Sequence, residues 1–496
     1  MSERLGEAGA DPDLFEAMRE KIARRARNQN APQRCIDAVQ AAVELPFEDG
    51  LAREREIFQA LVNADEAKAL RYAFFCERKA RDIPDIAKNT ATRRVDSAAV
   101  IGGGTMGSGI AMTLADAGIP VTLLELSGDA LEKAMDRIRG TYALSVKRGS
   151  IDEEEASRRL ALITPGTEYD ALAGSDMAIE AVFEDMEVKQ QVFAKLDAVM
   201  KTDAILATNT SALDIDAIAA ASGRPEALVG THFFSPANVM KLLEIVRGAR
   251  TTPEIIASVL ALAKAIGKVG VVCGNCDGFT ANRSRIPFNT EMNILIEEGA
   301  TPEQVDKVMV DFGYPMGPFA VADLAGGDIG YAGRKRREAD NPHARRLPIA
   351  DALVEMGRFG QKSGAGWYRY EPGNRAPLPD PEVERMIAEL RCELGVELRS
   401  HSDEEILHRI LFASVNEACK ILQEGIAYRP SDIDAMWLNG FGFPRYRGGL
   451  MYWADGIGVE AIHARMRDWE TTLGSRWHPA ELLSELADSG RRFADL

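Results

Sequence analysis

The stretch SAAVIGGGTMGSGIAMTLADAG, residues 97–118, decides the fold. A short apolar run at residues 97–101 leads directly into the glycine cluster, and an apolar helical run at residues 108–117 follows it. The cluster is a G-x-G-x-x-G motif, in which Gly102 permits a tight turn, Gly104 lets the backbone approach a pyrophosphate, and Gly107 allows helix and strand to pack closely. A strand, this turn and a helix in that order predict a dinucleotide site in a parallel α/β sheet.

The residue type at the end of the next expected strand indicates which dinucleotide binds. Glu125 stands there, about 20 residues after the glycine turn. A carboxylate accepts hydrogen bonds from a ribose 2′-hydroxyl and repels a 2′-phosphate, and no arginine follows at residues 126–128. We therefore expect NAD rather than NADP. A glycine turn that binds nothing is the alternative.

Strand patterns alternate with helical ones up to about residue 277, which is typical of a Rossmann-type doubly wound α/β sheet. Past residue 278 the pattern is mostly helical, and apolar residues at helical spacing between about residues 14 and 81 predict four short amphipathic helices. We expect strands at residues 97–101, 121–125, 161–164, 177–182, 204–207, 228–232, 242–246 and 269–273.

The helical region contains an internal repeat, which we interpret as an ancient duplication. The residues that recur are Glu298-Gly299, Pro302, Val305-Asp306 and Gly313-Tyr314-Pro315, matched by Glu424-Gly425, Pro430, Ile433-Asp434 and Gly442-Phe443-Pro444. The predicted domains are a helical appendage with a linker, a NAD-binding Rossmann domain and two duplicated all-α domains, at residues 1–95, 96–277, 278–375 and 376–496.

The composition restricts the class of protein. The chain has 496 residues and a formal net charge of −17, which disfavours nucleic acid and anionic membranes as partners. Six cysteines are too few for a secreted disulfide framework, and the C-x-x-C pair Cys273 and Cys276 lacks the further ligands of a zinc site, so we expect no metal. Because we find neither a signal peptide nor an apolar run long enough to span a membrane, we expect a cytoplasmic protein.

One histidine stands where ligands of open α/β sheets bind. His232 closes an expected strand, at the carboxyl edge of the sheet, and Glu244 lies in the next expected strand twelve residues later. Adjacent strand ends bring such side chains within reach of each other. A carboxylate beside an imidazole fixes its tautomer and raises its pKa, as a base that removes a hydroxyl proton requires. A satisfied core histidine is the alternative.

The chain resembles the 3-hydroxyacyl-CoA dehydrogenases of fatty-acid β-oxidation, especially the dehydrogenase half of multifunctional enzymes that join it to an enoyl-CoA hydratase. The order and spacing of the motifs match over roughly residues 97–330, the repeated helical region matches the multifunctional branch, and the first 95 residues resemble the tail of the hydratase half. Besides the glycine turn, the motifs are EAVFE at 180–184, NTS at 209–211, HFFSPA at 232–237, KLLE at 241–244, GFxxNR at 278–283 and GYPMGP at 313–318.

This resemblance implies four catalytic residues. His232 is the acid/base that takes the proton of the substrate's 3-hydroxyl while C3 gives its hydride to the nicotinamide, and Glu244 orients His232. Ser211 hydrogen-bonds the reacting oxygen, and Asn282 faces the substrate. The residues alone leave alternatives open, because Ser211 also suits a local side-chain turn and Asn282 also suits a helix cap.

The resemblance also implies the cofactor contacts. Glu184 and Lys189 contact the nicotinamide ribose region, although from the residues alone both are solvated helix charges. Many single-function relatives carry asparagine where this chain has Ser235, and the substrate aromatic of relatives falls on Trp453, which we leave out of the catalytic set. The expected cofactor residues are Gly102, Gly104, Met106, Gly107, Glu125, Val182, Glu184, Lys189, Ser211 and Ser235.

The sequence thus predicts an enzyme that oxidises (S)-3-hydroxyacyl-CoA to 3-ketoacyl-CoA with NAD. Fewer than 100 residues precede the sheet, so we expect no hydratase activity. The expected partners are the acyl-CoA substrate and, as a candidate protein partner, a thiolase or hydratase. For the chain itself we expect a monomer or a homodimer. A basic run at residues 334–337 suits either CoA phosphates or, preferably, a solvated helix face. Two alternative functions are a β-hydroxyacid dehydrogenase with a lysine-based site and a catalytically silent protein that retains the fold.

Overall fold

The computed structural model describes residues 11, 13–23, 26–342 and 344–496. The chain divides into two compact units, which are described separately. The first unit comprises Met1–Tyr72, Arg285–Val415 and Gly442–Gly448. The second comprises Ala73–Ser284, Asn416–Phe441 and Gly449–Leu496. The domain boundaries inferred above from the sequence stay a prediction.

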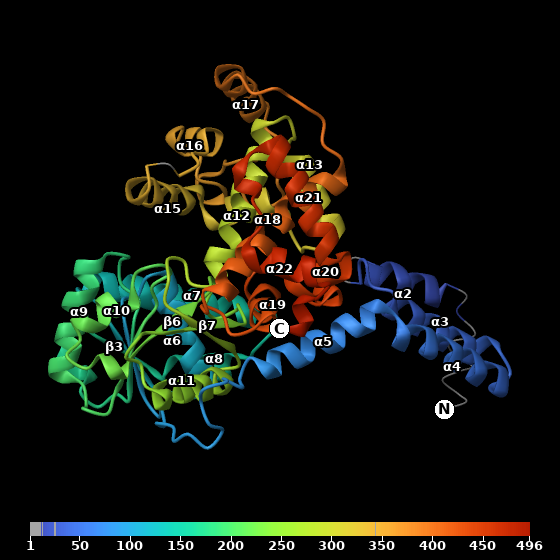
Figure 1. The fold of residues 1–496 in the computed structure, drawn as a ribbon. Helices are drawn as coiled ribbons and strands as arrows, with labels where there is room; N and C mark the ends of the chain where they lie inside the picture. Colours follow the sequence, from blue (N-terminus) through green and yellow to red (C-terminus); the bar gives the residue numbers. More distant parts are fainter. Residues whose placement is uncertain (1–10, 12, 24–25, 343) are drawn as a thin grey trace. The chain divides into compact units, whose positions relative to one another are not determined.

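An eight-stranded sheet forms the centre of the second unit (Figure 1). Its strand order is β3-β2-β1-β4-β5-β6-β7-β8. Each strand overlaps one of the eight expected from the sequence, with bounds that differ by at most two residues at either end. The strands are β1 (Ala98–Ile101), β2 (Val121–Leu124), β3 (Ile163–Gly166), β4 (Met177–Glu180), β5 (Ile205–Thr208), β6 (Leu228–Phe233), β7 (Leu242–Arg247) and β8 (Val269–Gly274).

The sheet is parallel from β3 through β6, but β7 runs antiparallel to β6 and β8 is parallel to β7. The sequence did not predict this reversal. Its physical reason is the short connection between β6 and β7 at residues 234–241, because a parallel crossover needs a dozen or more residues. The reversal brings the start of β7 next to the carboxyl end of β6, where the catalytic residues were expected.

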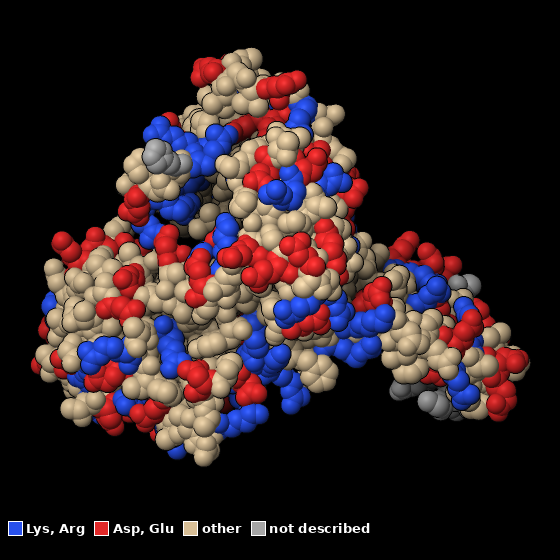
Figure 2. All heavy atoms as spheres, in the orientation of Figure 1, with Lys and Arg blue, Asp and Glu red and all other residues tan. Residues whose placement is uncertain are grey.

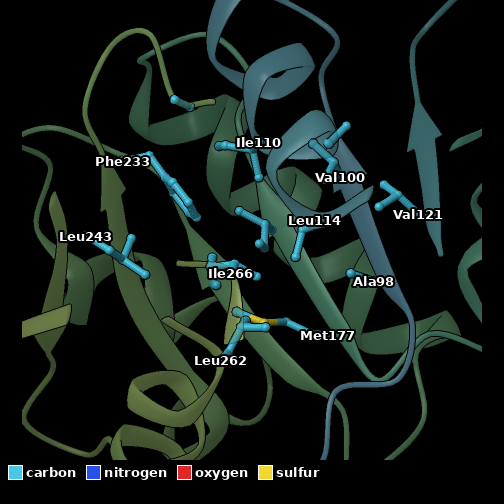
Figure 3. Packing of buried hydrophobic residues seen from close by; sticks show 14 of the residues in the cluster. Ala98, Val100, Ile110, Leu114, Val121, Met177, Phe233, Leu243, Leu262 and Ile266 are labelled. Atoms are coloured by element: carbon cyan, nitrogen blue, oxygen red, sulfur yellow. The ribbon is translucent and has the colours of Figure 1, made fainter. Parts of the chain in front are cut away.

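Helices surround this sheet and bury its apolar side chains. Ile110 and Leu114 of the helix that follows the glycine turn belong to the same buried cluster as Val100 and Val121 of the first two strands (Figure 3). The alternating strand and helix pattern of the sequence therefore produces one continuous core. The helices are α6 (Thr105–Asp116), α7 (Gly128–Lys147), α8 (Glu153–Leu160), α9 (Met186–Val199), α10 (Ile215–Ala220) and α11 (Pro253–Ala265).

The repeat seen in the sequence appears as two copies of a five-helix motif. The first copy is α12 (Ala281–Glu297), α13 (Pro302–Phe312), α14 (Pro318–Ala325), α15 (Gly327–Asp340) and α16 (Pro348–Glu355). The second copy is α18 (Asp403–Gln423), α19 (Pro430–Gly440), α20 (Leu450–Ile457), α21 (Val459–Leu473) and α22 (Glu481–Ser489). Even the joint between the third and fourth helix recurs, with Gly326 at φ 104° and Gly458 at φ 103°.

The remaining elements lie before, between and within these parts. Among the described residues, four helices precede the sheet, as the apolar spacing predicted. Few of their residues are buried: α4, for example, buries Gly50 and Ile57 while Phe47 and Phe58 are exposed. These helices and the one between the copies are α2 (Leu14–Ala23), α3 (Ala31–Glu44), α4 (Phe47–Asn63), α5 (Asp65–Lys79) and α17 (Pro381–Leu394). Short 3₁₀ turns lie at Tyr169–Leu172, Pro225–Ala227, Gln361–Ser363, Arg445–Arg447, Ser475–Trp477 and Phe493–Asp495.

The surface carries both signs of charge. On the face in Figure 2, acidic and basic side chains are interspersed, and Lys and Arg gather over α15. Among the described residues, no helix combines the length and the apolar character that crossing a bilayer requires.

Candidate active site

The glycine turn has the steric properties that a nucleotide-binding turn needs. Gly102 has φ +96°, and a Cβ there would lie 2.7 Å from the carbonyl oxygen of Ala181. A Cβ on Gly107 would lie 1.7 Å from the carbonyl oxygen of Gly102, so the first and third glycines are needed for packing within the protein. In contrast, a Cβ on Gly104 would meet nothing within 4 Å. The middle glycine therefore faces open space, where a pyrophosphate can approach the backbone.

Glu125 lies directly beside this turn. Its Oε1 accepts a hydrogen bond of 2.6 Å from the Gly103 amide, and its Oε2 accepts one of 3.1 Å from the Leu126 amide. At its N-terminus α6 has no side-chain cap from Gly104, which leaves the dipole and first amides of the helix for an anion. A carboxylate for a ribose hydroxyl and an uncapped helix for a pyrophosphate fit NAD.

His232 and Glu244 are directly opposite each other in the β6–β7 ladder. The Nδ1 atom of His232 lies 2.8 Å from Oε2 of Glu244, so the contact expected from the sequence is present. The carboxylate only accepts hydrogen bonds, and Nδ1 therefore carries the proton. Both side chains are buried, with Glu244 fully enclosed. This tautomer leaves Nε2 as the ring nitrogen with a free lone pair, which suits a general base.

The second oxygen of Glu244 has a separate task. Oε1 accepts hydrogen bonds from the backbone amides of Thr280 at 2.9 Å and Ala281 at 2.8 Å, and the thiol of Cys273 lies 3.4 Å away. One carboxylate thus orients the imidazole and caps the N-terminus of α12, the helix that carries Asn282. Burial and the nearby Glu244 raise the pKa of the Cys273 thiol, so this cysteine stays protonated. Sequence reasoning missed this second task.

The turn before α12 places an aromatic ring against the imidazole. Gly278 and Phe279 both adopt left-handed backbone angles, with φ of 72° and 52°. For a phenylalanine this conformation is strained, and full burial of the side chain holds it in place. The ring of Phe279 meets His232 edge-on at 5.9 Å, and the ring of Phe234 lies 4.4 Å from the imidazole on another side. The imidazole is therefore fixed by packing as well as by Glu244.

Glu184 collects the residues expected around the nicotinamide ribose. Its Oε1 accepts hydrogen bonds from the Thr210 hydroxyl at 2.6 Å and from the Ser211 amide and hydroxyl at 2.8 and 3.1 Å. The buried ammonium of Lys189 bridges Glu184 at 3.2 Å and the enclosed Glu180 at 2.7 Å. Burial alone would raise the pKa of Glu184, but Lys189 and these hydrogen bonds lower it, so the group is a carboxylate.

Ser211 and Asn282 come together at the same edge of the sheet. The Asn282 side-chain amide lies 3.4 Å from the carbonyl oxygen of Ser211. The local side-chain turn that offered an alternative for Ser211 is made by Thr210 instead, whose hydroxyl accepts from the Leu213 amide at 2.9 Å. The helix-cap alternative for Asn282 is filled by Glu244, as described above. Both side chains are half-buried and thus remain accessible to a ligand.

Other expected residues occupy varied positions. Ser235 is exposed on the connection between β6 and β7, while Met106 and Val182 are half-buried near the glycine turn and after β4. Trp453 is buried within α20. In the basic run of α15, Arg334 pairs with Asp351 at 2.7 Å, consistent with a helix face held by ion pairs. No group of three or more His, Cys, Asp or Glu suited to a metal ion occurs in the part of the chain that the structure describes.

Lys268 is a further residue that sequence reasoning missed. Its buried ammonium donates hydrogen bonds to the carbonyl oxygens of Ala237 and Met240, at 2.5 and 2.6 Å. The same Ala237 carbonyl accepts a hydrogen bond from Thr113 of α6 at 3.1 Å. The connection between His232 and Glu244 is thereby tied to the helix that begins at the glycine turn. A lone lysine in an otherwise apolar stretch before a strand is the only sequence signal for it.

Comparisons with known proteins identify the family of the domains. The family model of the 3-hydroxyacyl-CoA dehydrogenase NAD-binding domain matches residues 97–276. The model of the C-terminal domain of the same enzymes matches twice, at residues 278–370 and 406–493. The double match covers both helical copies and supports the interpretation of a duplication.

Two curated relatives match almost the whole chain. The peroxisomal bifunctional enzyme of Cavia porcellus is 42% identical, with 96% of this chain and 68% of the relative covered. The human peroxisomal bifunctional enzyme is 41% identical, with 95% of this chain and 67% of the relative covered. Because these relatives are named as peroxisomal, the expectation of a cytoplasmic protein is wrong. The sequence features on which that expectation rested do not separate cytoplasm from peroxisome.

Solved structures show the same fold. The 3-hydroxybutyryl-CoA dehydrogenase of Escherichia coli K12 is 30% identical with a TM-score of 0.68, over 80% of this chain and all of that one. The dehydrogenase part of multifunctional enzyme 1 from C. elegans is 28% identical with a TM-score of 0.63, over 84% of this chain and 96% of that one. The (S)-3-hydroxybutyryl-CoA dehydrogenase of Ralstonia eutropha, 32% identical with a TM-score of 0.52, covers 56% of this chain with its full length.

Proposed function

This chain belongs to the NAD-dependent 3-hydroxyacyl-CoA dehydrogenase family, and on that basis we propose that it oxidises (S)-3-hydroxyacyl-CoA to 3-ketoacyl-CoA in fatty-acid β-oxidation. In this proposal His232 is the general base and Glu244 is its orienting partner. The observation that carries the proposal is the 2.8 Å contact between Nδ1 of His232 and Oε2 of Glu244. That contact leaves Nε2 as a base at the carboxyl edge of the sheet.

The substrate's 3-hydroxyl gives its proton to Nε2 of His232, and the oxygen's electron pair forms the carbonyl as the C3–H bond breaks. NAD, when bound, accepts the hydride from C3. The imidazolium that results is stabilised by the Glu244 carboxylate, which is held in place by the amides of Thr280 and Ala281. In the reverse direction His232 returns the proton to the substrate oxygen.

The remaining residues bind and orient. The Asn282 amide binds the substrate, and Ser211 approaches the reacting oxygen with its hydroxyl, which in this structure rests on Glu184 at 3.1 Å. Glu125 holds the adenosine ribose, while Gly102, Gly104, Met106 and Gly107 receive the pyrophosphate. Val182, Glu184, Lys189 and Ser235 line the nicotinamide end. These assignments are supported by the shared motifs and by the contacts described above.

The substrate class is tested by following NADH consumption with acetoacetyl-CoA and, separately, with free acetoacetate. We expect rapid turnover of the thioester and at least about a hundred-fold lower kcat/KM for the free acid, because the free acid lacks the CoA contacts that position the carbonyl. Comparable rates would favour a β-hydroxyacid dehydrogenase. No NADH consumption with either would indicate a catalytically silent protein.

We also propose that these 496 residues do not themselves hydrate enoyl-CoA, because the described residues before the sheet form the short helices α2 to α5, which bury few side chains. Incubation with crotonyl-CoA without NAD should leave the enoyl absorbance unchanged. Hydration of crotonyl-CoA by the purified chain would contradict this proposal.

A further inference from the structure

Two arginines, one in each helical copy, form ion pairs with glutamates of the other copy. In the second unit, Nε of Arg283 lies 2.8 Å from Glu417, and its two terminal nitrogens lie 2.5 and 2.8 Å from the two carboxylate oxygens of Glu424. In the first unit, Arg409 pairs with Glu291 at 2.7 Å and with Glu298 at 2.5 Å. Each arginine therefore binds two glutamates from the other helix of the pair α12 and α18.

The residues involved are equivalent positions of the repeat. Each position in or directly after α12 stands 126 residues before the equivalent position in or directly after α18, as 283 and 409, 291 and 417, and 298 and 424 show. The arginine of the first copy contacts the glutamates of the second copy, and the arginine of the second copy contacts the equivalent glutamates of the first. This reciprocity is the mark of a two-fold interface, here built within one chain.

The surroundings of the two arginines differ. Arg283 directly follows Asn282, whereas Arg409 directly follows His408, which stacks on Phe412 at 4.6 Å. The first turn of α12 is anchored on one side by Glu244 and on the other by α18 and α19, since the Ser284 hydroxyl accepts a hydrogen bond of 3.0 Å from the Trp437 indole. Asn282 lies between these anchors.

The Arg283 contacts are strong enough to set the position of that turn. Bidentate hydrogen bonds between guanidinium and carboxylate fix both distance and orientation. The Arg283 side chain is 18% exposed and Glu417 is 17% exposed, so water competes only weakly for this pair. The hydrogen bonds that Arg283 donates to Glu424 and Glu417 also raise the pKa of Arg283, so the folded protein favours the charged guanidinium.

We propose that Arg283 is a positioning residue of the reaction, which holds Asn282 in its substrate-binding place by tying the first turn of α12 to Glu417 of α18 and to Glu424, which directly follows α18. The second helical copy thereby supports the active site through the position of Asn282. This inference rests on the proposed role of Asn282. Displacement of a substrate-positioning group by about 1 Å lowers the rate by up to about 10².

The test is a kinetic double-mutant cycle with acetoacetyl-CoA and NADH, using Asn282→Ala, Arg283→Met and the double variant. We expect Arg283→Met to lower kcat/KM for acetoacetyl-CoA on the order of ten-fold while the dissociation constant of NADH changes less than about two-fold. In the Asn282→Ala background the same substitution should change kcat/KM less than about two-fold, because its effect passes through Asn282.

Arg409→Met is the matched control, since it removes the equivalent ion pairs without touching the helix turn that carries Asn282. It should leave kcat/KM within about two-fold of the original value for the folded protein. Arg283→Lys and Glu424→Gln provide milder changes should Arg283→Met fold poorly, and they should produce smaller losses of the same pattern. An undiminished Arg283→Met effect in the Asn282→Ala background, or unchanged kcat/KM in all Arg283 and Glu424 variants, would overturn the inference. Loss of activity in a His232 variant tests the proposed function separately.

Discussion

The two helical copies share a framework but differ in what surrounds it. In each copy an aspartate caps the third helix: Asp306 accepts from the amides of Phe319 and Ala320, and Asp434 from those of Met451 and Tyr452. A second aspartate in each copy, Asp323 or Asp455, accepts two consecutive amides of a later segment. The aspartate hydrogen bonds that hold each motif together are thus present in both copies.

The equivalent positions Asn282 and His408 have different surroundings. Asn282 of α12 lies beside Ser211, whereas His408 of α18 lies 3.8 Å from Glu404 of its own helix. The same helix pair therefore places an asparagine at the edge of the sheet in one copy and a histidine beside a glutamate of its own helix in the other. The difference teaches that function in this protein depends on local residues and not on the helical fold itself.

The largest expected effect is on the free energy of unfolding, which should fall by different amounts when Arg283 and Arg409 are replaced. Arg409 is fully buried and its partner Glu291 is 4% exposed, whereas Glu424 beside Arg283 is 49% exposed. Arg409→Met removes a fully buried cation from Glu291 and Glu298 and should lower the free energy of unfolding by about 3–5 kcal/mol. Arg283→Met should cost clearly less, and urea unfolding of both variants measures the difference. Equal losses would show that burial does not distinguish the two sites.

The next effect concerns Asp306, the aspartate that caps the third helix of the first copy, and the pH dependence of stability. Burial raises the pKa of Asp306 from 3.8 to about 6, although three hydrogen bonds oppose the shift. The folded protein therefore binds a proton more tightly than the unfolded chain. This contribution to stability is complete below about pH 4 and is lost as the pH rises through about 6, up to about 3 kcal/mol.

Asp306→Asn removes this titration. Relative to that variant, the original protein should lose stability between pH 4.5 and pH 7, as measured by urea unfolding at each pH. Asp434→Asn provides the same change in the second copy as a matched comparison. If the curves of the original protein and Asp306→Asn run parallel across this range, the shifted pKa is not present.

A third comparison is catalytic. Asn282→Ala should lower kcat/KM for acetoacetyl-CoA by about 10–10², because one positioned hydrogen bond to the substrate is lost. His408→Ala, at the equivalent position, should leave it within about two-fold. Steady-state kinetics of both variants measure this contrast. A similar loss in the two variants would mean that the copies do not differ as described.

The smallest expected effect is on NAD affinity and concerns a residue that lies in neither helical copy. Glu125→Ala removes the carboxylate beside the glycine turn and should weaken NAD binding by about ten-fold, as the loss of one charge-assisted hydrogen bond predicts. The affinity for acetoacetyl-CoA should stay the same. An unchanged dissociation constant for NAD by fluorescence titration would mean that another group holds the ribose.

Much of this arrangement could be predicted from the sequence because it depends on local patterns. The strands, the glycine turn and the approach of His232 to Glu244 follow from residues close together in the chain. Three features were not predicted. They are the hydrogen bonds from the start of α12 to Glu244, the hydrogen bonds that Lys268 donates, and the ion pairs of Arg283 and Arg409 with glutamates of the other copy. They depend on how distant elements pack, and a charged residue in a helix gives no local sign of a partner more than 100 residues away, such as Glu417, which lies 134 residues after Arg283.

The most direct test of the account is the turnover of His232→Gln. We expect kcat with acetoacetyl-CoA and NADH to fall by about 10²–10⁴, because a positioned general acid/base supplies that factor, while the dissociation constant of NADH stays close to its original value. Turnover near that of the original protein in a correctly folded His232→Gln variant would contradict the account.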